Sequence, residues 1–255
     1  LIPWTRNWIS WENIAFASSI PIRGAYFLNL FQALIVIFII CDIERKRRKA
    51  ETREVFSARP IGNRQSLLGE FLGILVPFGV VDIIFMIACV VIGIIIPDSP
   101  IDLWVNLFYL LTLIFIIGLS LLVNKLFKQP FISWVILTSF LYFACNYWVT
   151  PLYGILDFRG SILPISFSTL IGFVYLGDYL LQRIVFLFLG ISFLCFAVLF
   201  TKRKPNTSDR KHYLIVSASL FLVLALVLGG IYVGKFQARL ENRIAYRETF
   251  LKYNE

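Results

Sequence analysis

The chain has few of the residues that catalytic and metal centres use. It contains one histidine, His212, and four cysteines without CxxC spacing, and no GxxxxGK[ST] phosphate loop occurs in it. Neither a multi-histidine metal site nor a histidine-based triad can be built from one histidine, and ATP chemistry needs such a loop. We therefore expect no catalytic residue, no metal site, no cofactor and no enzymatic activity in this chain. The cysteines are interpreted as small buried apolar residues: Cys41, Cys89, Cys145 and Cys195.

Charged residues are also scarce. They make up 15% of the 255 residues, whereas hydrophobic residues make up 59%. Such a chain cannot hide its apolar side chains in one water-soluble core, so we predict an all-α polytopic membrane protein whose surroundings are the lipid bilayer. The net charge of +9 could suggest nucleic acid, but the basic residues lie between apolar runs and meet lipid headgroups there. No nucleic-acid partner is expected.

Six apolar runs are long enough to cross the roughly 30 Å hydrocarbon layer, which takes about 20 helical residues. The second run is overlong and contains Pro77 and Asp82, so we expect it to kink, to tilt or to begin at the interface. The six predicted transmembrane helices are residues 25–41, 67–96, 101–123, 131–149, 184–200 and 213–234.

The basic residues predict the orientation of these helices. Fifteen of the 24 Lys and Arg residues fall on one side, in residues 44–69, the loop at 125–128 and residues 202–211. The positive-inside rule makes this side cytoplasmic. We predict a multi-pass protein of the plasma membrane, the inner membrane of a cell with two membranes.

Both ends of the chain would then face outward. Residue 1 is Leu rather than Met, no signal peptide precedes the first span, and the sequence stops at residues 253–255 in the middle of a charged, helix-like run. We expect a fragment, with at least one membrane helix before Leu1 and more protein after Glu255.

The segment after the first span predicts an elbow at the cytoplasmic surface. Pro60 removes a backbone donor and disfavours helix at Arg59, so an amphipathic stretch at 51–58 should end there. Asn63 or Ser66 can cap the helix that returns to the membrane. The plain alternative is a solvated basic loop that only sets topology.

This elbow resembles that of the transmembrane subunits of ABC-2 type exporters. That family has a pattern like Glu-x-Leu-x-Ala-x-Pro-Ile-x-x-Arg after its second helix, and this chain has EVFSARPIGNR from Glu54 to Arg64. Phe56 replaces a leucine-like residue, and Glu70 stands where lysine is common. The resemblance covers roughly residues 25–200.

We expect the chain to divide into three parts, of which the resemblance covers only the second. Residues 1–24 would be an outer-face interfacial segment, and 25–200 a transmembrane unit that lacks its first helix. Residues 201–255 would add a further membrane helix, continuing as an amphipathic stalk into an outer-face extension. The family has short re-entrant helices where this chain has residues 150–183. An ordinary interfacial loop is the other reading of that segment, and both stay open.

The resemblance also implies the function. Two permease units, identical or different, would form a substrate pathway, and a cytoplasmic ABC ATPase that binds ATP would dock on the elbow. The family pattern assigns this coupling to Glu51, Thr52, Glu54, Phe56, Pro60, Ile61 and Arg64. The alternative is a multispan membrane scaffold or a lipid-modifying enzyme with its active groups outside this fragment. The transported substrate does not follow from the sequence.

Asp82 is the pathway candidate. An ionised group inside a membrane span is costly, so a carboxyl there favours either a pathway or interhelical contact, or a neutral packing residue near a kink. Both readings stay open. Asp157 and Arg159 are expected to form an exposed turn pair.

Overall fold

The structure is a computed structural model, and the residues that it describes form a bundle of six helices. It describes residues 20–49, 62–95, 109–127, 129–146, 152–158, 167–168, 172–173, 176–201 and 211–253. The helices are α2 (Ile20–Arg47), α4 (Asn63–Ile95), α6 (Tyr109–Leu126), α7 (Pro130–Asn146), α8 (Leu176–Phe200) and α9 (Lys211–Tyr253). Two short strands, β1 (Phe167–Ser168) and β2 (Gly172–Phe173), pair antiparallel.

The helices confirm an all-α polytopic membrane protein. Four of them are long and apolar enough to cross a membrane, and two shorter apolar helices, Leu110–Leu126 and Pro130–Asn146, lie among them. Lipid offers no hydrogen-bond partners to the backbone, whereas an α-helix pairs its own N–H and C=O groups. Apolar runs of this length therefore fold as helices. Each helix overlaps one of the six predicted spans.

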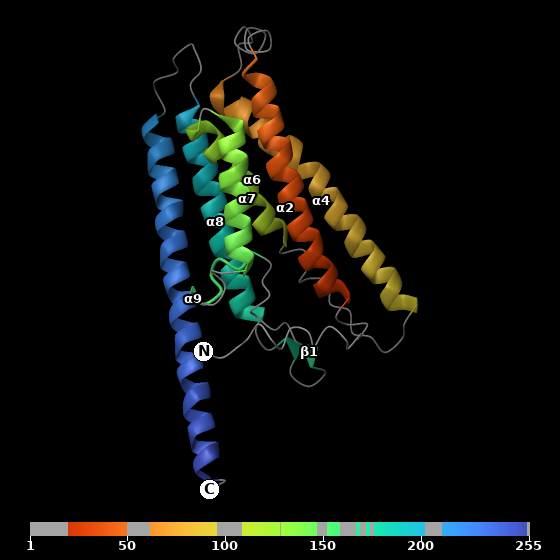
Figure 1. Cartoon of the computed structure of the whole chain (residues 1–255), viewed down its shortest axis with the longest axis vertical. Helices are drawn as coiled ribbons and strands as arrows, with labels where there is room; N and C mark the ends of the chain where they lie inside the picture. Colours follow the sequence, from red (N-terminus) through yellow and green to blue (C-terminus); the bar gives the residue numbers. More distant parts are fainter. Residues whose placement is uncertain are drawn as a thin grey trace.

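The helices alternate in direction, so their ends collect on two sides of the bundle (Figure 1). One side, which we call the basic end, lies at the top of Figure 1. It holds the C-terminal ends of α2, α6 and α8 and the N-terminal ends of α4, α7 and α9. The other side, which we call the opposite end, holds the N-terminal ends of α2, α6 and α8 and the C-terminal ends of α4 and α7.

Helix α6 is the centre of the bundle. It packs against α8, α2, α4 and α7, and most extensively against α8. Its side chains Leu113, Ile117 and Leu121 are buried. By contrast, α4 and α9 expose apolar residues along most of their length, as helices at a lipid boundary do.

Several helices extend beyond the predicted spans, and α2 covers residues 20–47 rather than 25–41. Helix α8 begins at Leu176 rather than at residue 184, because its polar first turns are buried against protein and do not need to face water. Helix α9 runs unbroken from Lys211 to Tyr253, so the predicted continuation beyond Gly234 as helix is confirmed. Pro77 lies inside α4 without ending it.

Candidate functional site

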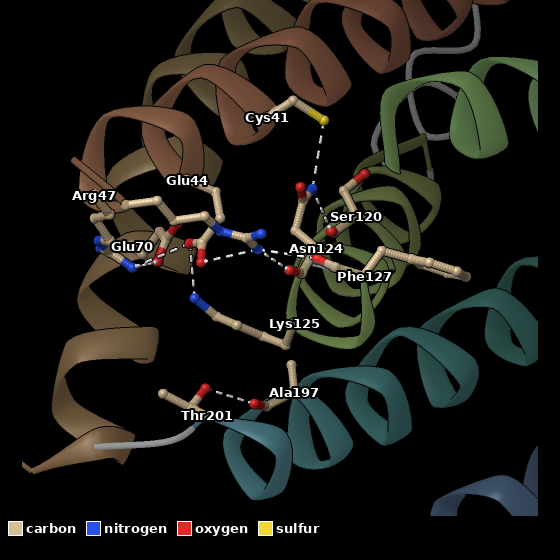
Figure 2. A network of polar contacts seen from close by, with 11 residues as sticks. Cys41, Glu44, Arg47, Glu70, Ser120, Asn124, Lys125, Phe127, Ala197 and Thr201 are labelled. Atoms are coloured by element: carbon tan, nitrogen blue, oxygen red, sulfur yellow. Dashed lines mark hydrogen bonds and ion pairs between the residues drawn. The ribbon is translucent and has the colours of Figure 1, made fainter. Parts of the chain in front are cut away.

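A network of ion pairs and hydrogen bonds lies at the basic end, where the elbow joins the bundle (Figure 2). Arg47 in the last turn of α2 donates from Nη1 to Glu70 Oε2 of α4 at 2.6 Å. The Glu70 side chain is only 3% exposed. This pair therefore joins the two helices that enter and leave the elbow.

A second contact joins α2 to the end of α6. Glu44 accepts from Lys125 Nζ at 2.8 Å, and both side chains are almost fully buried. Arg48 Nη2 donates to the carbonyls of Asn124, at 2.6 Å, and Phe127, at 3.0 Å. The last carbonyls of a helix lack helical donors and carry partial negative charge, so a guanidinium there caps α6.

The first residue of α4 contacts the end of α8. Asn63 Nδ2 donates to the carbonyl of Thr201 at 3.1 Å, and Thr201 Oγ1 donates to the carbonyl of Ala197 at 2.7 Å. The predicted capping residue Asn63 thus binds a neighbouring helix. The end of α2 and the beginning of α4, which flank the predicted elbow, are consequently attached to α6 and to the end of α8.

The predicted coupling residues divide into two groups. Arg64 lies half-buried in the first turn of α4, next to this network. The others lie outside the described residues: Glu51, Thr52, Glu54, Phe56, Pro60 and Ile61. Their role stays a prediction, and the structure describes the anchors on either side of them.

Asp82 lies buried between α2 and α4, far from the basic end. Its Oδ1 accepts from Gln32 Nε2 at 2.7 Å, and Gln32 Nε2 also lies 3.5 Å from the carbonyl of Phe78. One turn along α2, Asn29 Oδ1 accepts from Thr112 Oγ1 of α6 at 3.1 Å. Asp82 therefore makes a contact between α4 and α2. This contact is compatible with both readings of the residue, so its role as a pathway residue stays a prediction.

The turn at residues 152–158 packs into the opposite end of the bundle. The carbonyl of Phe158 accepts from Asn29 Nδ2 and from Arg183 Nη1, both at 3.0 Å. The carbonyl of Gly154 accepts from Gln182 Nε2 at 2.5 Å, and Gly154 has a positive φ of 76°. Non-helical backbone at membrane depth needs such protein donors. Whether 150–183 also holds a re-entrant helix stays a prediction, since much of it lies outside the described residues.

The expectation of an exposed turn pair is wrong for Asp157. This residue is fully buried, because the turn folds inward onto α8 and does not project into water. Arg159 lies outside the described residues. Nearby, Arg239 of α9 pairs with Asp178 in the first turn of α8. The α9 continuation is therefore attached to the bundle through charge.

Sequence reasoning missed the partners at the basic end. Glu44, Glu70 and Lys125 resemble ordinary charges of a basic loop, and nothing in their spacing shows that they meet. The available signal was their position, since each lies within about one turn of the end of an apolar run.

Within the part of the chain that the structure describes, no group of three or more His, Cys, Asp or Glu residues could hold a metal ion. No protein-family model, curated protein or solved structure matches this chain.

Proposed function

We propose that this chain is a transmembrane subunit of an ATP-driven exporter of the ABC-2 type. It would lie in the plasma membrane, with its basic end in the cytoplasm. The proposal rests on the motif from Glu54 to Arg64 and on its position between two membrane helices. ATP would be bound by a separate ATPase subunit, and a second permease unit would complete the pathway.

The observation that carries the proposal is the attachment of both sides of the elbow. Arg47 with Glu70 holds its two flanking helices together, and Glu44 with Lys125 fastens α2 to α6. A push on the elbow would therefore reach the core helices as rigid-body motion. A loop that only sets topology needs no buried ion pairs at its base.

The ATPase contact is tested by substitution of the elbow. We expect the full-length protein, purified in mild detergent from its native membrane, to bring with it an ATPase subunit with a phosphate loop, identified by mass spectrometry. Glu54→Ala or Phe56→Ala should reduce the recovered ATPase and the ATP hydrolysis rate at least several-fold, because both side chains lie in the motif assigned to docking.

Asn206→Ala, in the other large loop predicted on the same side, is the matched control and should leave assembly unchanged. ATPase assembly that survives deletion of residues 51–61 would overturn the proposal.

A further inference from the structure

The Asp82 carboxyl is only partly satisfied by its surroundings. The residue is 7% exposed, and its Oδ1 accepts one hydrogen bond from the neutral amide of Gln32. Its Oδ2 has no hydrogen-bond partner among the residues that the structure describes. An ionised carboxylate with one neutral donor is an unfavourable species in an apolar region, and such groups take up a proton instead.

The charged groups of the neighbouring helices lie far from this carboxyl. On α2, Glu44 is twelve residues from Gln32, and on α4, Glu70 is twelve residues from Asp82, about 18 Å along each helix at 1.5 Å per residue. Both belong to the network at the basic end, together with Arg47, Arg48 and Lys125 of α6, and Asp42, Arg45, Lys46 and Arg64 lie in the helix turns at that end. Toward the opposite end, Arg23 of α2 is nine residues from Gln32, about 14 Å along the helix.

The remaining titratable groups of the packed helices lie in contacts that do not involve Asp82. On α8, Arg183 binds the carbonyl of Phe158 and lies over the Tyr179 ring, and Asp178 pairs with Arg239. Tyr26 of α2 packs in the apolar cluster with Phe85, the thiols of Cys41 and Cys89 are buried, and Cys195 lies half-buried on α8. Among the described residues, Gln32 is the only side chain that hydrogen-bonds to Asp82.

The polar side chains that follow Gln32 most closely lie toward the opposite end. Asn29 is one turn along α2 and accepts from Thr112, and it donates to the carbonyl of Phe158 at that end. Toward the basic end, α2 instead presents Val36, Ile37 and Ile40, all fully buried in the apolar core, and the buried Ser120 and Asn124 of α6 are engaged with each other and with Cys41. The polar groups nearest to Gln32 along α2 therefore lie on the side of the 152–158 turn.

We propose that Asp82 is a proton-binding site within the membrane, reached from the opposite end of the bundle. A proton from water on that side forms the Oδ2–H bond and converts the carboxylate to a neutral carboxyl, while Oδ1 keeps its hydrogen bond from Gln32. This inference does not depend on the exporter proposal, because it uses only contacts inside the bundle.

The test is labelling with a lipid-soluble carbodiimide, which reacts with protonated carboxyls. The whole protein in liposomes of neutral lipid should be modified at Asp82 near neutral pH, as located by peptide mass spectrometry, and modification should decline as pH rises. Asp82→Asn should lose the label, whereas Asp178→Asn, whose carboxyl is ion-paired, should keep it. At a fixed pH, Gln32→Leu should react several-fold faster, because the ionised form loses its only donor.

Sidedness is tested with a pH difference across the liposome membrane. Acid on the side of the 152–158 turn should raise the labelling rate of Asp82 several-fold, and acid on the basic side should not. Absence of label at Asp82, or labelling independent of pH, would overturn the proton site. Labelling that responds to acid on the basic side would overturn the proposed route. Circular dichroism shows whether each variant folds. The labelling of the native protein is sufficient to test both the proton site and the route, so a variant that fails to fold does not affect either result.

Discussion

At the scale of single residues, burial separates the ion pairs that hold the bundle from those that do not. Glu44 and Lys125 have side chains 11% and 10% exposed, and they connect two helices. Asp42 and Lys46, 35% and 68% exposed, form a pair within one turn of α2. Water screens the second pair and not the first. Neighbouring carboxylates of one helix therefore have different roles.

We expect Glu44→Gln to destabilise the protein by about 3–5 kcal/mol, because the substitution leaves the ammonium of Lys125 buried without its carboxylate. The free energy of unfolding in mixed micelles of detergent and denaturing surfactant measures this loss.

Asp42→Asn is the matched control, since it makes the same isosteric change two residues away. It should cost less than about 1 kcal/mol, as exposed pairs do. Equal losses for the two variants would show that the Glu44 contact with Lys125 is no stronger than a surface pair.

At the scale of elements, the contact of α6 with α8 depends on two glycines. A Cβ on Gly118 would lie 2.5 Å from the carbonyl oxygen of Gly190, and a Cβ on Gly190 would lie 2.8 Å from the backbone of Phe115. The missing side chains let the two backbones meet, which is a common way for membrane helices to pack. Around this point Phe115 packs edge-on against Phe186, with ring centroids 4.9 Å apart.

Gly118→Ala should therefore force α6 and α8 apart and destabilise the fold by about 1–3 kcal/mol, the usual range for overpacking. The shift of the thermal unfolding midpoint in detergent reports this change.

The control is Gly73→Ala on α4, where a Cβ would meet nothing within 4 Å. It should be neutral or stabilising, by up to about 1 kcal/mol, because alanine favours helix over glycine. A Gly118→Ala protein as stable as the native one would mean that the two helices are not in contact at this point.

At the scale of the whole molecule, the alternating helices place at one end the helix ends that flank three segments, and these segments together hold 15 of the 24 Lys and Arg residues. The ends of α2 and α4, of α6 and α7, and of α8 and α9 all lie there (Figure 1). Helix α9 continues past the opposite end of the bundle. The charge asymmetry predicts that the basic end faces the cytoplasm.

Cysteine labelling in intact cells measures this orientation. In a chain whose native cysteines are replaced by alanine, Glu241→Cys on α9 should react with a membrane-impermeant maleimide. Lys49→Cys should react only after the membrane is made permeable. Both positions are exposed, so access depends on the side and not on burial. Reaction of Lys49→Cys in intact cells would invert the topology and remove the basis for ATPase coupling at the elbow.

The sequence by itself determined the class, the number of helices and their alternation. These follow from the length of each apolar run and from the distribution of Lys and Arg, which are local quantities. Cys41, Cys89 and Cys145 are buried, as their single placement in apolar runs predicted, whereas Cys195 is only half-buried. The bounds of α8 were predicted too short, because Gln182 and Arg183 look unsuitable for a span until their partners, the carbonyls of Gly154 and Phe158, are known.

Only the tertiary structure decided which polar groups meet. Glu44 and Lys125 are 81 residues apart in the chain, Gln32 and Asp82 are 50 apart, and Asn29 and Phe158 are 129 apart. No spacing rule within a helix relates positions so distant. Their contacts arise because close-packed glycines and apolar side chains fix the helices beside one another, and the carboxylates, amides and carbonyls that come into contact there then have no water to bind.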